Sequence, residues 1–134
     1  MKKIILLIIL SFATVSLFAQ KESPRETAII KLMNVKKGMQ SVNTLPDSMT
    51  KNLDPKKADE FKAEMAVLKK ELIEKAIAKF KADYTAKEID FIYEECTSDK
   101  IDYTDLTNGF FSKWRQLKGK IYFSRAKETY FKYL

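Results

Sequence analysis

The carboxylates with the best spacing for chemistry lie in one stretch of the chain, at Glu94, Glu95, Asp99, Asp102 and Asp105. Calcium takes about six to eight oxygen ligands, and such a cluster could supply several of them. The spacing differs from that of an EF-hand loop, and no glycine is present to make that loop's sharp turn. We therefore expect no metal here and interpret these residues as helix caps and solvated side chains.

The other residue types needed for catalysis are scarce. The 134-residue sequence has no histidine, one cysteine and three glycines. A Ser-His-Asp triad, a histidine-ligated zinc and a histidine base are therefore excluded within this chain, and no glycine-rich phosphate loop is present. Cys96 has no histidine to activate it, so we interpret it as a small buried residue. We predict that the protein is not an enzyme and has no cofactor; an enzyme using carboxylates alone remains an alternative.

Basic and aromatic residues alternate near the C-terminal end of the sequence. A surface of this kind suits a nucleic acid or an anionic membrane, while a solvated basic rim around a core helix is the simpler alternative. No nucleic-acid-reading motif is present, so we expect no nucleic-acid partner. The candidate interaction surface consists of Lys113, Trp114, Arg115, Lys118, Tyr122 and Arg125.

The N-terminal segment has the features of a signal peptide. Lys2 and Lys3 precede a mainly apolar stretch from Ile4 to Ala19, which is 16 residues long. A membrane-spanning helix needs about 20 apolar residues, so export followed by cleavage is favoured. We predict cleavage after Ala19, and a periplasmic or secreted protein of a Gram-negative bacterium. Residues 20–134 then form the mature chain, a length that suits a single domain.

The mature chain has helical rather than strand periodicity, and we predict an all-α bundle of about five helices. Ser23 and Pro24 suit a helix start. A second helix is expected from Val35, weakened at its start by Gly38 and stopped by Pro46.

The next two helices have the clearest signals. Asp54 and Pro55 open the longest one, and Thr85 with Glu88 forms a capping box for its successor. Apolar residues repeat every three or four positions along the long helix, as a core-facing band requires. The members of that band are Phe61, Met65, Leu68, Leu72, Ala76 and Phe80. The following helix should bury Ile89, Ile92, Tyr93 and Cys96.

The last helix is expected to start at Thr104 or Asp105 and poses a geometrical problem. In a regular helix Phe110 and Trp114 would lie nearly opposite Ala126, so the helix would have two apolar faces. We expect a bend at Gly119 that turns both faces toward one core.

Charge is divided between two parts of the chain. Residues 83–105 contain eight acidic and two basic residues, whereas residues 110–134 contain seven basic and one acidic residue. We expect the acidic and basic helices to be neighbours that flank a shared apolar seam.

The stretch Tyr84-Thr85-Ala86-Lys87-Glu88-Ile89, followed by Phe91-Ile92-Tyr93 and Ser98, resembles a secreted bacterial family called domain of unknown function 2059. The specific similarity covers about twenty residues, within a looser family-like core over residues 61–117. Asp99-Lys100-Ile101 stands where the family has proline and glycine, which places this chain on a divergent branch. The resemblance implies a small exported helical protein and supplies no catalytic or binding residues.

The sequence therefore predicts a non-catalytic exported helical domain that acts as an interaction module of the cell envelope. Its partner is expected to be an envelope protein. The alternative is peripheral binding to an anionic membrane surface through the same basic aromatic helix. The oligomeric state is not indicated by the sequence.

Overall fold

The computed structural model describes residues 24–134, and every regular element in that range is helical. The predicted signal peptide of residues 1–19, its cleavage after Ala19 and the cap at Ser23 lie outside the described residues. The elements are α2 (Pro24–Asn34), the 3₁₀ turn η1 (Val35–Lys37), α3 (Gln40–Met49), α4 (Pro55–Asp83), α5 (Ala86–Thr97), α6 (Asp105–Leu117), the π-helical turn η2 (Lys118–Phe123) and α7 (Ser124–Phe131). Since α6, η2 and α7 form one continuous helix, the prediction of a small all-α fold with about five helices is confirmed.

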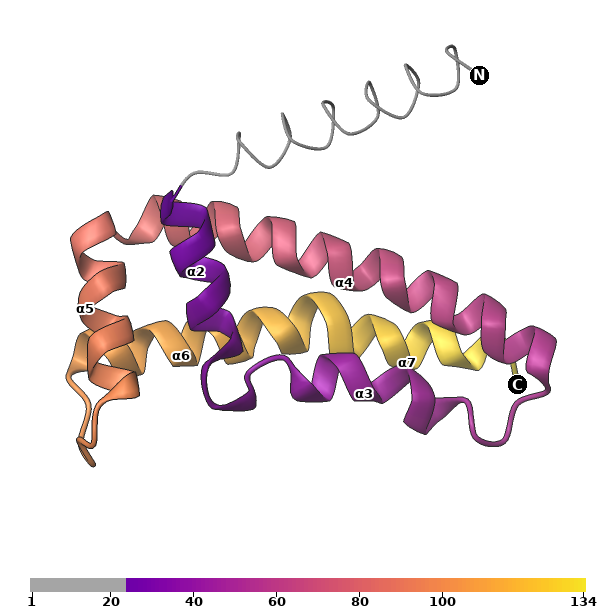
Figure 1. Cartoon of the computed structure of the whole chain (residues 1–134). Helices are drawn as coiled ribbons and strands as arrows, with labels where there is room; N and C mark the ends of the chain where they lie inside the picture. Colours follow the sequence, from indigo (N-terminus) through magenta and orange to yellow (C-terminus); the bar gives the residue numbers. More distant parts are fainter. Residues whose placement is uncertain (1–23) are drawn as a thin grey trace, which may run out of the picture.

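Two long elements determine the shape of the bundle. Helix α4 and the continuous C-terminal helix run alongside each other (Figure 1). Helices α2 and α5 pack together at one end, and α3 packs against α4 and η2 farther along. The core lies between these layers, where apolar residues from every α-helix are buried.

Helix α4 has the predicted start and the predicted core face. The Asp54 side chain accepts a hydrogen bond from the backbone N–H of Lys57 at 3.0 Å, and Pro55 occupies the first helical position. Such caps satisfy donors that the first turn leaves unpaired. All six members of the predicted apolar band are buried.

The turn into α5 also follows its local signals. Glu88 N–H donates to Thr85 Oγ1 at 3.1 Å, and Thr85 N–H donates to Glu88 Oε1 at 2.9 Å, which completes the capping box. Ile89 and Ile92 are fully buried, but Tyr93 is 40% exposed. Tyr93 therefore lies at the edge of the predicted stripe rather than in the core.

The prediction that Pro46 stops the second helix is wrong, because α3 begins at Gln40 and continues to Met49 with Pro46 inside it. A proline within a helix removes the hydrogen bond to the carbonyl four residues earlier, here that of Val42. The Tyr122 hydroxyl donates to this carbonyl at 2.8 Å and replaces the missing backbone donor. A side chain from the far end of the sequence thus makes the internal proline tolerable.

The π-helical turn η2 brings the two apolar faces of the C-terminal helix onto one side. Phe110 and Trp114 are buried before this turn, and Tyr122 and Ala126 are buried after it. A π-helical turn takes up about one extra residue, and each residue of an α-helix rotates by about 100°. Ala126 consequently lies about 60° from Phe110 around the axis, instead of about 160°. Both faces point to one core, as expected. The change of direction is made by a π-helical turn that contains Gly119.

Candidate functional site

The six residues predicted to form one interaction surface do not all reach the surface. Trp114 is 2% exposed and Tyr122 is 1% exposed, so the prediction is wrong for these two residues. Both rings pack inward, and their polar atoms donate to backbone carbonyls of α2 and α3. Aromatic residues with one polar atom are suited to such a position.

Three side chains on one face of the C-terminal helix donate hydrogen bonds to backbone carbonyls far away in sequence. Trp114 Nε1 donates to Met33 O at 3.2 Å, Lys118 Nζ donates to Gly38 O at 2.8 Å, and Tyr122 donates to Val42 O. Positions 114, 118 and 122 share a face because they are four residues apart. We call these three bonds the carbonyl ladder.

The carbonyl ladder serves groups that the local helices leave unpaired. Met33 belongs to the last turn of α2, where carbonyls lack helical donors. Gly38 precedes α3, and the Val42 carbonyl loses its partner at Pro46. Burial raises the pKa of Tyr122 to about 12, so its hydroxyl remains a donor at physiological pH. Much of the predicted surface therefore has a structural role.

Lys113 and Arg125 also make internal contacts, with α4. Lys113 Nζ lies 3.3 Å from Asp83 Oδ2, and Arg125 Nη1 lies 2.6 Å from Glu71 Oε2. Hydrogen bonds from Lys75 and Arg125 hold the pKa of Glu71 below its ordinary value, so this carboxylate stays charged. Exposed pairs of this kind contribute little to stability and mainly set orientation.

Arg115 and Lys118, the remaining members of the predicted surface, border a pocket between α6 and the connection from α2 to α3. Its volume is about 310 Å³. It is lined by Val35, Lys36, Gly38, Tyr103, Asn108, Phe111, Trp114, Arg115 and Lys118. We call it the Lys36 pocket. Three lining residues are cations, three are aromatic and none is a carboxylate.

An unusual backbone brings Lys36 to this pocket. Lys36 has φ 53° and ψ 41°, and Lys37 has φ 59°. The left-handed region costs a non-glycine residue about 1–2 kcal/mol. The chain then returns so tightly that a Cβ atom on Gly38 would lie 2.2 Å from the Met33 carbonyl oxygen. With this backbone conformation, Lys36 Nζ lies 4.2 Å from the centre of the Tyr103 ring.

The charge in the Lys36 pocket is uncompensated. Across residues 24–134, no ion pair joins Lys36, Arg115 or Lys118 to a carboxylate. Burial and the neighbouring Arg115 charge lower the pKa of Lys118, as expected where positive charges are crowded together. An acidic group would relieve this crowding, and the aromatic walls could pack against the carbon atoms that carry it. Lys36 was not predicted as a site residue, because its place beside α6 depends on the irregular connection between α2 and α3.

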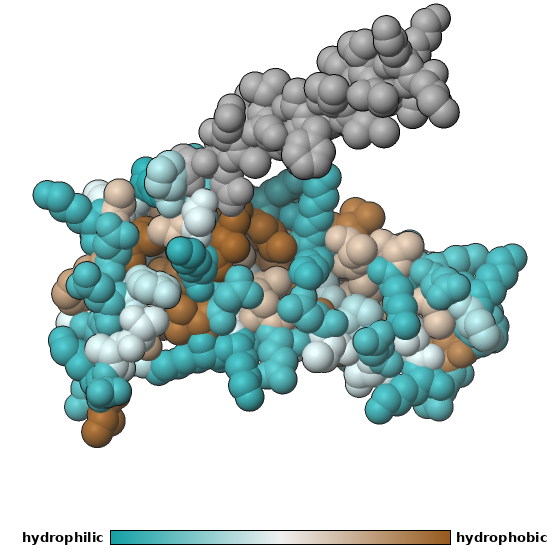
Figure 2. Space-filling model, viewed as in Figure 1, coloured by the Kyte–Doolittle hydropathy of each residue, from teal (hydrophilic) through white to brown (hydrophobic). Residues whose placement is uncertain are grey.

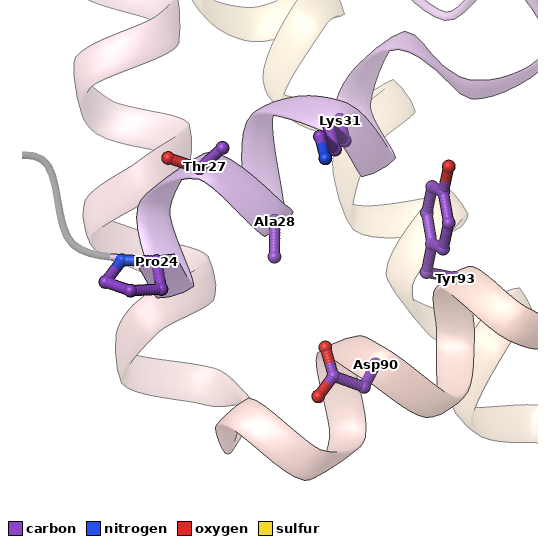
Figure 3. A pocket seen from close by; sticks show the side chains of 6 residues that line it. All are labelled: Pro24, Thr27, Ala28, Lys31, Asp90 and Tyr93. Carbon is purple, nitrogen blue, oxygen red and sulfur yellow. The ribbon is translucent and has the colours of Figure 1, made fainter.

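A larger groove of about 460 Å³ lies between α2 and α5. Ala28 of α2 points into it, with Asp90 and Tyr93 of α5 on the opposite side (Figure 3). Its charged lining residues are one cation, Lys31, and one carboxylate, Asp90. This balanced lining gives the groove no clear preference for an anion or a cation.

In the described part of the chain, no group of three or more histidine, cysteine, aspartate or glutamate side chains is placed to hold a metal ion. Glu95 is instead only 4% exposed. Its Oε1 atom accepts hydrogen bonds from the Thr104 N–H at 2.6 Å and the Thr104 hydroxyl at 2.9 Å. Burial raises the pKa of Glu95, but these bonds outweigh burial and hold it below the ordinary value of 4.5.

We expect Glu95→Gln to remove part of the acid sensitivity of folding. Because the folded-state pKa is lowered, the Glu95 charge contributes stability above pH 4.5, and this contribution is lost as the pH falls further. The difference in unfolding free energy between wild type and E95Q should therefore shrink from pH 7 to pH 3. Urea unfolding at several pH values measures this. Asp90→Asn, on the exposed side of α5, is the control, and an equal pH dependence for E95Q and wild type would contradict the assignment.

Cys96 is buried at 5% exposure, and burial raises the pKa of its thiol. A thiol of raised pKa forms little of the reactive thiolate, which agrees with its interpretation as a packing residue.

No helix in the described range is both long enough and apolar enough to cross a membrane. Comparisons of the chain with protein-family models, curated proteins and solved structures found no match.

Proposed function

We propose that this protein is a non-catalytic binding domain exported to the cell envelope, and that the Lys36 pocket holds an acidic group of a partner protein. One observation carries the proposal: Lys36, Arg115 and Lys118 converge on a pocket with no lining carboxylate and no ion-pair partner among residues 24–134. Elsewhere on the same helix Lys113 and Arg125 are paired with α4.

The volume and the lining residues of the Lys36 pocket favour a protein side chain as its ligand. Its volume of about 310 Å³ is at the lower end of the range for small-molecule sites. Val35, Phe111 and Tyr103 offer apolar surface beside the three cations. A short acidic segment that also carries an apolar residue would use both kinds of wall.

The location of this activity rests on the N-terminal sequence. Residues 1–19 have the basic start, apolar centre and small-residue end of a signal peptide. The resemblance to the secreted family called domain of unknown function 2059 supports the same assignment.

Binding to an anionic membrane is the less favoured alternative. That hypothesis needs Trp114 and Tyr122 at the surface, where aromatic residues would enter the lipid boundary. Both are buried and donate to backbone carbonyls.

The proposal can be tested with Trp114, the single tryptophan of the sequence, whose ring lines the pocket. We expect titration with a short peptide of aspartate and isoleucine residues to give a saturable change in its fluorescence. Added salt should weaken binding by screening the charges. The double variant K36E/R115E should show no saturable change.

The matched control is K120E/K127E, which makes the same charge change at exposed residues outside the pocket. It should bind the peptide like the wild type. Equal loss in both double variants would mean that overall charge, rather than the pocket, attracts the peptide. Strong sedimentation of the wild-type chain with phosphatidylglycerol vesicles, without peptide binding, would favour the membrane alternative.

A further inference from the structure

The loop between α5 and α6 presents an apolar side chain to solvent. Ile101 is 95% exposed, and Figure 2 shows a hydrophobic group at the tip of this loop. Asp99 and Asp102 flank it, and both are exposed. Lys100, between them, lies with its Nζ atom 3.9 Å from the buried Glu95 carboxylate. Within residues 24–134, Asp99 and Asp102 therefore have no ion-pair partner. We call residues 99–102 the acidic tip.

This acidic tip is held in a defined position. The Glu95 carboxylate accepts two hydrogen bonds from Thr104 at one end of the loop. At the other end the Ser98 hydroxyl donates to the Glu95 carbonyl at 2.8 Å. A loop held at both ends loses less conformational freedom when it binds. The exposed isoleucine is thus presented on an ordered support.

The acidic tip is complementary in charge to the Lys36 pocket. It combines one apolar side chain with two carboxylates, and the pocket combines apolar walls with three cations. The tip and the pocket are neighbours, since Tyr103 of this loop also lines the pocket. The exposure of Ile101 shows that the tip does not enter the pocket of its own chain.

We propose that the acidic tip of a second copy of this chain occupies the Lys36 pocket. Ile101 packs against Val35 and Phe111, while Asp99 and Asp102 face the cations. Because tip and pocket adjoin, a two-fold arrangement lets each copy give its tip and receive its partner's. This inference rests on the proposed function, since it names one partner for the same pocket. The tip and pocket form a small contact, so the dimer belongs to the weak class of interfaces below about 1,200 Å².

A charge exchange tests the dimer directly. In sedimentation equilibrium of the chain without its signal segment, the average mass of the wild type should rise toward that of a dimer between about 10 µM and about 1 mM. K36E/R115E and D99K/D102K should each dimerise at least about tenfold more weakly, because like charges then meet at both contacts. A one-to-one mixture of the two variants restores opposite charges at both contacts and should recover the dimer.

The outcomes separate this inference from the proposed function. A wild-type chain that stays monomeric at about 1 mM, or a mixture that fails to recover dimer, overturns the second copy as occupant. If the aspartate and isoleucine peptide still changes Trp114 fluorescence, the pocket remains a site for acidic partners. Without that fluorescence change, the proposed function fails as well. Circular dichroism of each variant verifies folding, and K120E/K127E should dimerise like the wild type.

Discussion

Replacing Phe80 with alanine is expected to lower the free energy of unfolding by about 3–5 kcal/mol, through lost burial and the cavity that remains. Phe80 is fully buried where α4 meets the C-terminal helix. Its ring centre lies 4.3 Å from that of Phe110 and 6.4 Å from that of Trp114. Domains of this size have a total stability of about 5–15 kcal/mol, so the variant should be barely folded or unfolded.

Urea or guanidinium unfolding monitored by circular dichroism measures the Phe80 effect. The control is Phe131→Ala, because Phe131 is 59% exposed and its loss should change stability by less than about 0.5 kcal/mol. A loss below about 1 kcal/mol for F80A would contradict a closed core at this position.

Removal of the Tyr122 hydroxyl should cost about 1–3 kcal/mol although the ring remains, because Tyr122→Phe leaves the buried Val42 carbonyl without its donor. The comparison variant is Tyr130→Phe. Tyr130 is half-buried against Phe61, and its hydroxyl makes no hydrogen bond within the described residues. Equal effects for the two substitutions would show that the bond to Val42 contributes nothing specific.

The effect of Tyr122→Phe should also depend on Pro46. In a Pro46→Ala background the new backbone N–H of residue 46 can donate to the Val42 carbonyl, as in an uninterrupted helix. Tyr122→Phe should then cost less than it does in the wild type. A double-mutant cycle measured by chemical unfolding should give a coupling of about 0.5–3 kcal/mol between positions 46 and 122. Additive effects would refute the view that Tyr122 substitutes for the donor that proline lacks.

Signals that act over three or four residues were sufficient to predict much of the fold. The Asp54 cap depends on Lys57, and the Thr85 capping box depends on Glu88. The core band of α4 follows from helical spacing, which places residues three or four apart on one face. These features were predictable because their causes lie within a single helical turn.

The candidate site was only partly predictable from the sequence. Arg115 and Lys118 were included in the predicted surface, and both line the Lys36 pocket. Lys36 was missed, although Gly38 marks the tight return of the chain beside it. Trp114 and Tyr122 were assigned to the surface because alternating basic and aromatic residues suit either a binding face or a core helix with a basic rim.

The sequence by itself determined the helical class of the described chain, the starts of its central helices and the absence of histidine chemistry. Tertiary structure alone decided that Pro46 stays inside a helix, that Trp114 and Tyr122 turn inward, and that three cations share one pocket. The physical reason is distance along the chain. The carbonyl ladder joins residues 80 or 81 positions apart. No local pattern specifies which distant carbonyl will need a donor once the helices have packed.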